Sequence, residues 1–126
     1  MIDKIKDQLE SFIDLHPEYE LQKVFYGRAY DPNDDLMFWN YIVVSRLATT
    51  IDSTKSNDTY MIIVAHENYI PKGCVLNLVD HLEKNIPGLR IAPRSAEYDY
   101  TFKGNSQLVV EGVGLEFSAP SKRCCR

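Results

Sequence analysis

Residues 38–45 (FWNYIVVS) and residues 60–66 (YMIIVAH) decide the fold of this chain of 126 residues. Both runs are rich in aromatic and β-branched side chains, which favour β-strands. Residues 49–58 (TTIDSTKSND) lie between them, are nearly all polar, and are far more numerous than a hairpin turn requires. The pattern therefore predicts two long strands joined by a polar loop from Thr49 to Asp58, which we expect to project toward another molecule.

The first of these strands is expected to lie inside its sheet. Both alternating sets of positions in residues 38–44 are apolar. Successive side chains of a strand point to opposite faces, so both faces of this strand must be covered.

Two amphipathic helices are predicted on either side of these strands. Apolar residues recur at helical spacing from Ile2 to Ile13, and Pro17 disfavours helical geometry beyond His16. A second pattern of this kind spans residues 74–85 and stops before the Pro-Gly pair at 87–88. Each helix has a single apolar stripe, which indicates that both pack on one face of the sheet.

The remaining strand candidates are residues 21–26, 89–92, 96–102 and 107–117. The order of elements predicts an α+β fold with a mostly antiparallel sheet of about four main strands packed against two helices. The second face of the sheet is expected to be partly open.

Length and composition fit one domain at residues 1–120, followed by a basic tail at residues 121–126. The net charge of −4 argues against general nucleic-acid binding by a basic surface. No apolar run approaches the roughly 20 residues of a membrane helix, and the N-terminus lacks the apolar segment of a signal peptide. We expect a protein without membrane contact that is made in the cytoplasm.

No catalytic, cofactor or metal site is predicted. The histidines are far apart in the sequence, and none has an orienting acid and a nucleophile at a suitable position. We therefore expect them to be solvated. The cysteines have neither a disulfide framework nor the spacing of metal ligands. These residues are His16, His66, His81, Cys74, Cys124 and Cys125.

Two further patterns have structural interpretations. Residues 31–35 (DPNDD) have turn chemistry and lack the ligand spacing of a calcium loop. Tyr98, Tyr100 and Phe102 alternate with acidic or small residues, and the acidic charge would repel nucleic-acid phosphates. The aromatic residues are therefore interpreted as core packing or as a contact between subunits.

With these elements in place, the chain resembles the tail terminator (tail completion) proteins of long-tailed bacteriophages. The resemblance rests on the leading helix, the aromatic-rich strand start WNYIVV at 39–44, and the polar loop after it. It continues through the strand ending VAHENYI at 64–70, the helix at 74–85, and the final hairpin at 97–117. It spans nearly the whole chain and consists of an order of elements rather than a catalytic signature.

The resemblance implies a structural virion protein of the tail or neck, without enzymatic activity or cofactor. Such proteins form a ring, typically of six subunits, at the head-proximal end of the tail tube. The ring stops tube growth and meets the head-side connector or stopper protein. DNA passes through its lumen without specific binding. The residues expected at a subunit or tube interface are Thr49, Asp52, Lys55, Asn57, Asp34, Asp35, Tyr98 and Tyr100.

Two alternatives remain at this point. The same order of elements fits another phage neck or head-completion component. It also fits a small host α+β domain that binds a ligand or acts as an enzyme.

Overall fold

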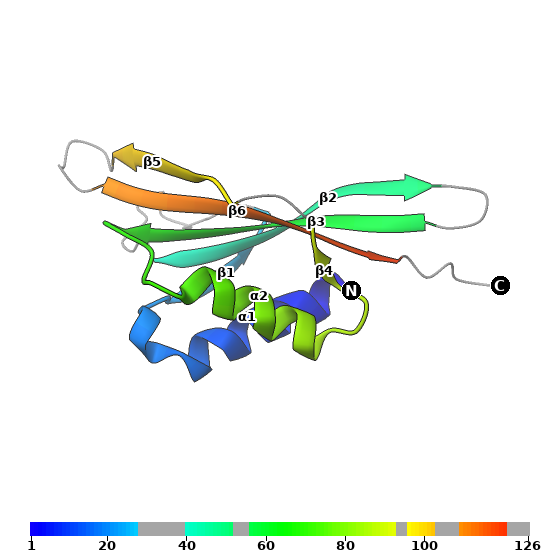
Figure 1. Cartoon of the computed structure of the whole chain (residues 1–126), viewed down its shortest axis with the longest axis horizontal. Helices are drawn as coiled ribbons and strands as arrows, with labels where there is room; N and C mark the ends of the chain where they lie inside the picture. Colours follow the sequence, from blue (N-terminus) through cyan, green and yellow to red (C-terminus); the bar gives the residue numbers. More distant parts are fainter. Residues whose placement is uncertain (28–39, 52–55, 93–95, 103–108, 121–126) are drawn as a thin grey trace.

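A sheet of six strands carries two helices on one face in the computed structural model (Figure 1), which describes residues 1–27, 40–51, 56–92, 96–102 and 109–120. The helices are α1 (Ile2–Leu15) and α2 (Cys74–Asn85), with a short 3-10 helix η1 (Pro17–Tyr19) between α1 and the sheet. The strands are β1 (Lys23–Tyr26), β2 (Tyr41–Ile51), β3 (Ser56–Glu67), β4 (Arg90–Ile91), β5 (Tyr98–Phe102) and β6 (Val109–Pro120).

The order of strands in the sheet is β1-β2-β3-β6-β4, and β5 also pairs with β6. β1 runs parallel to β2, whereas the other described pairings are antiparallel. The predicted α+β class is confirmed. The prediction of about four strands in a mostly antiparallel sheet was imprecise, since the sheet is mixed and has six. The 12 residues of β6 are enough for β4 and β5 to pair one after the other along the same side.

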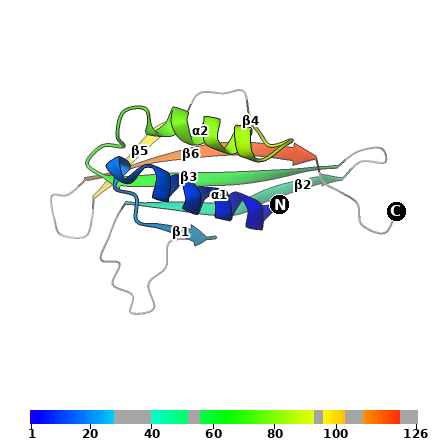
Figure 2. The same ribbon diagram turned by 90° about the horizontal axis from the view of Figure 1, so that it is seen from below.

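Both helices cover the same face of the sheet (Figure 2). α1 ends at Leu15, where the His16 amide donates to the Phe12 carbonyl and Pro17 follows; the predicted end is confirmed. The apolar side chains between the helices and this face of the sheet form the core. Burying a side chain of leucine size contributes roughly 1.5–3 kcal/mol, so this core dominates the stability of the domain. Its fully buried members include Ile5, Leu9, Phe12, Leu78, Leu82, Ile42, Val44, Ile62 and Val64.

β2 is an internal strand, as predicted. It lies between β1 and β3. Ile42 and Val44 are buried under the helices, and Val43 is buried on the opposite face. Phe38 and Trp39, which belonged to the same prediction, lie outside the described residues.

The predicted polar loop from Thr49 to Asp58 is wrong. β2 and β3 continue through it as a paired hairpin, in which Thr49 faces Asp58 and Ile51 faces Ser56. The register shifts between Arg46 and Ala48, which is the signature of a β-bulge. Polar residues form strands here because the paired backbone satisfies its own hydrogen bonds, while the side chains of residues 49–51 and of Asn57 are exposed. Residues 52–55 lie outside the described residues.

Gly114 allows a close approach on the sheet face away from the helices. A Cβ atom at this position would lie 3.3 Å from the Met61 sulfur of the neighbouring strand. The approach is close only at Gly114, since a Cβ at Gly112 would make an ordinary contact at 3.8 Å.

Candidate interaction surfaces

The first candidate surface is the distal hairpin, residues 47–51 of β2 and 56–59 of β3. Figure 1 shows both strands continuing beyond the helices. Leu47 and Ile51 are exposed, Ile51 to 80%. The Thr49 hydroxyl donates to an Asp58 carboxylate oxygen at 2.8 Å. The hairpin thus presents exposed apolar side chains on a paired two-stranded ribbon, a geometry suited to contact with another protein.

The second candidate surface is the tyrosine surface, made of Tyr69, Tyr98 and Tyr100, whose side chains are 72%, 45% and 56% exposed. Glu111 anchors it from β6, where its side chain is buried. One Glu111 carboxylate oxygen accepts a hydrogen bond from the Ile70 amide at 2.7 Å. A hydrogen bond to Glu111 also raises the pKa of Tyr100. Exposed tyrosines held by a buried acid resemble the aromatic anchors of protein interfaces.

The structure divides the predicted interface residues between these two surfaces. Thr49 and Asn57 lie on the distal hairpin and are exposed, whereas Tyr98 and Tyr100 lie on β5 at the opposite end of the long axis (Figure 1). Because Tyr98 and Tyr100 are exposed, of the two interpretations given to them a subunit contact remains and core packing does not. The other predicted residues, Asp34, Asp35, Asp52 and Lys55, lie outside the described residues.

Sequence reasoning missed Tyr69 and Glu111. Glu111 left a signal, because it is the one acid at an alternating position shared with Val109, Val113 and Leu115. A charged residue on an apolar strand face is typical of a satisfied buried acid or of a site. Tyr69 left no such signal, since the contact between the loop after β3 and the start of β6 is tertiary.

His66 is buried, so the expectation that it is solvated is wrong. Its Nδ1 lies 2.8 Å from the Glu67 carbonyl oxygen and its Nε2 lies 2.9 Å from the Tyr19 carbonyl oxygen. A neutral imidazole donates from one nitrogen and an imidazolium from both. The ring ties η1 to β3, which is a structural role.

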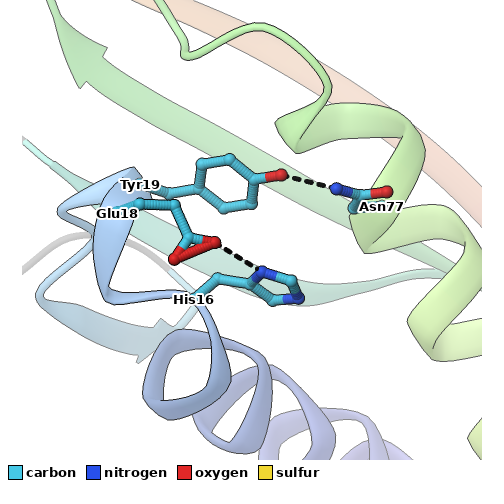
Figure 3. Close-up of polar contacts among 4 residues, drawn as sticks. All are labelled: His16, Glu18, Tyr19 and Asn77. Atoms are coloured by element: carbon cyan, nitrogen blue, oxygen red, sulfur yellow. Dashed lines mark hydrogen bonds and ion pairs between the residues drawn. The ribbon is translucent and has the colours of Figure 1, made fainter.

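A second polar group joins η1 to α2 (Figure 3). The Asn77 side-chain amide donates to the Tyr19 hydroxyl, and the His16 ring stacks on Tyr19 with centroids 5.1 Å apart. His16 Nδ1 is hydrogen-bonded to Glu18 at 2.8 Å. This bond lowers the pKa of Glu18. These side chains are used in packing and hydrogen bonding.

His81 is half-buried between the two helices rather than solvated. Its ring lies 5.7 Å from the Phe12 ring. Its Nε2 is buried without a well-formed hydrogen bond to any described residue, although the Gln8 backbone favours its protonation. Desolvation outweighs that effect and lowers the pKa of His81.

An open hollow of about 810 Å³ lies between the start of α1 and the base of the distal hairpin. Arg46, Asp58 and Tyr60 line it from the sheet, and Met1 and Lys4 line it from the helix. Its charges are of both signs. The hollow has the size of a small-molecule site but lacks the mainly apolar lining that such sites have.

Among the described residues, no group of three His, Cys, Asp or Glu side chains could hold a metal ion. Neither α1 nor α2 is long and apolar enough to cross a membrane. No known protein family matches the chain, and no curated protein matches it either.

Proposed function

We propose that this chain is a structural virion protein, a tail terminator that forms a ring at the head-proximal end of a phage tail tube. The ring stops tube growth and joins the tail to the head-side connector. Its partners are other copies of the chain, the tube protein and the connector protein.

One observation carries this proposal: two exposed surfaces at opposite ends of one long sheet, the distal hairpin and the tyrosine surface. A ring subunit between tube and connector needs separate contact surfaces on a rigid body. The buried ionisable side chains of His66 and Glu111 make hydrogen bonds that hold parts of the fold together. These features favour assembly over catalysis.

The experiment is to add the purified protein to polymerising tube protein and to measure tube lengths by electron microscopy. We expect shorter tubes, each with one ring of the added protein at a single end. A ring of six chains of 14.5 kDa has a mass of about 87 kDa in solution. Unchanged tube lengths and tube ends without a ring, measured with the added protein in excess, would contradict the proposal.

The open hollow at the start of α1 supports a second candidate, a ligand-binding domain. A thermal-shift screen of small charged metabolites tests it, because a ligand that binds only the folded state raises its stability. Stabilisation that is lost in Arg46→Ala and retained in the exposed variant Lys72→Ala would favour this candidate over assembly.

A further inference from the structure

The sheet ends on one side at β1 and on the other side at β5, and in the described residues no strand pairs with the outer side of either one. The neighbouring end strand, β4, is different. Its Ile91 amide donates to a Glu83 carboxylate oxygen of α2 at 2.9 Å, so a side chain covers that edge. Unpaired edges are templates for pairing with another chain, and proteins that do not use them protect them.

The outward backbone groups of β1 belong to Val24 and Tyr26. The Gly27 amide donates to the Val44 carbonyl of β2 at 2.9 Å, which orients the odd-numbered positions of β1 toward β2. Backbone groups alternate along a strand. The amides and carbonyls of Val24 and Tyr26 therefore point away from the sheet.

The outward backbone groups of β5 belong to Tyr98 and Tyr100. The Asn68 amide donates to the Val109 carbonyl, so that end of β6 directs Val109 toward β3 and the alternate positions toward β5. The backbone amide and carbonyl of Asp99 therefore point toward β6. Tyr98 and Tyr100 on either side of it point their backbone groups outward.

The two edges are complementary in direction and in face. β1, β2 and β6 run one way, and β3 and β5 run the other way. If the sheet continues into a second copy in the same orientation, β1 meets β5 as an antiparallel pair. The side chain of Val24 lies in the core on the helix side, and Tyr98 shares a row with core residue Val113. The residues whose backbone groups point away from the sheet, such as Val24 and Tyr98, thus have their side chains on the same face at both edges. An antiparallel pair requires this arrangement.

The two edges are also complementary in charge. Lys23, Tyr41, Ala65, Gly112 and Asp99 form one continuous row across the sheet. Lys23 at one end and Asp99 at the other are both exposed and lie on the face away from the helices. Opposite charges that face each other across strands stabilise the pair. Continuing the row without an offset places Lys23 of one copy against Asp99 of the next.

The exposed tyrosines supply apolar area at the same place. Tyr26 is exposed on β1, and Tyr98 and Tyr100 are exposed on β5. All three lie on the helix side of their strands, and the register that places Lys23 against Asp99 puts Tyr98 opposite Val24 and diagonal to Tyr26. Buried aromatic residues are the usual anchors of interfaces.

We propose that a second copy of this chain docks on these edges, with β1 of one copy pairing antiparallel with β5 of the next. Lys23 faces Asp99 across each seam, and the tyrosines pack on its other side. The contact is head-to-tail, and repeating it closes a ring when each step turns the next copy by an equal fraction of a full rotation. This inference rests on the ring of the proposed function and names the surfaces that close it.

A charge-reversal cycle tests the seam. The variants Lys23→Glu and Asp99→Lys each place like charges across it, and we expect self-association in sedimentation velocity to weaken by about three- to tenfold. The double variant restores the pair and is expected to return to within about twofold of the original protein. Lys84→Glu and Asp80→Lys make the same charge changes at exposed sites on α2 and serve as matched controls.

Cross-linking provides a second readout that detects weak contacts. Lys23→Cys and Asp99→Cys are combined in a chain carrying Cys124→Ser and Cys125→Ser. Directly opposed residues in a non-hydrogen-bonded antiparallel pair have Cα atoms about 4.5 Å apart, which suits a disulfide. We expect a covalent ladder that ends at the ring, whereas Lys23→Cys with Lys84→Cys, which lies on α2, gives none.

The outcomes separate the seam from the function. A ring that binds tube ends but ignores charge reversal and gives no ladder would overturn the seam alone. A protein that stays monomeric with and without tube ends would overturn the ring, and the seam with it. Selective loss in the single variants together with recovery in the double variant supports both.

Discussion

Cys74 shows at the residue scale how burial removes a reactive group from chemistry. Its side chain is fully buried at the start of α2, and desolvation raises the pKa of its thiol from 9.0 to about 11. Thiolate is the reactive form of cysteine. A side chain with nucleophilic potential is therefore inert while the domain is folded.

The prediction for Cys74 is slow labelling. In the variant Cys124→Ser and Cys125→Ser, a thiol reagent at about pH 8 should react roughly 100-fold more slowly with the folded protein than with the urea-unfolded protein, because two pKa units remove about 99% of the thiolate. Absorbance after adding an aromatic disulfide measures the rate. A folded-state rate within tenfold of the unfolded rate contradicts this prediction.

His81 is expected to make the domain sensitive to acid. Its folded-state pKa lies below the ordinary value of 6.5, so the unfolded chain binds the proton more tightly. Stability is therefore lost as the pH falls through 6.5 toward the folded-state value. Urea midpoints at about pH 7.5 and pH 5.5 measure the difference.

The variant His81→Gln should flatten this pH dependence, since it removes the titrating ring. His16→Gln is the comparison variant: the charge of His16 also contributes to lowering the pKa of His81, after desolvation, so this variant should reduce the pH dependence only in part. An unchanged slope in His81→Gln would assign the acid sensitivity to other groups.

The distal hairpin illustrates what happens at the scale of an element. Beyond the bulge at Leu47 the strands leave the helices, and their side chains no longer add to the core. The backbone pairing between Thr49 and Asp58 continues all the same. Backbone hydrogen bonds therefore order the hairpin, although it lies outside the core. We infer that it contributes more to contacts with other proteins than to the folding of the domain.

Shortening the hairpin should leave the domain folded and impair assembly. Residues 50–57 are replaced by Asn-Gly, which forms the two-residue turn that joins paired strands, directly between Thr49 and Asp58. We expect the free energy of unfolding to change by about 1 kcal/mol or less, and control of tube length to be lost. Circular dichroism and electron microscopy measure the two effects. A folded, shortened variant that still limits tube length would remove the hairpin from the mechanism.

Charge is the property that matters at the scale of the whole molecule. Residues 1–120 carry 11 Lys and Arg against 18 acidic residues, because three of the basic residues are in the tail. A net charge of about −7 repels DNA phosphates. This suits a ring through which DNA slides without sticking.

The assembled protein is therefore expected not to retard duplex DNA in a gel at low salt. Each phosphate contact to Lys or Arg adds salt-sensitive affinity, so weak binding would be most visible under these conditions. Tight binding that disappears with added salt would contradict the tail-channel interpretation. A variant lacking residues 121–126 would then show whether the basic tail is responsible.

The sequence by itself determined the elements whose signals are local. The apolar spacing from Ile2 and the proline at position 17 placed α1 and its end, and residues 74–85 matched α2. The apolar alternation around Ile42 correctly predicted an internal strand. These features depend on helical or strand periodicity and on proline geometry, which neighbouring residues specify without help from the rest of the chain.

Only the tertiary structure decided the rest, because it depends on partners distant in sequence. Residues 49–58 read as a loop from their polarity, yet pairing between β2 and β3 makes strands of both ends. His66 read as solvated, yet the Tyr19 carbonyl, 47 residues away, buries and binds it. Lys23 and Asp99 carried no joint signal, since only the register of four strand pairings places them in one row.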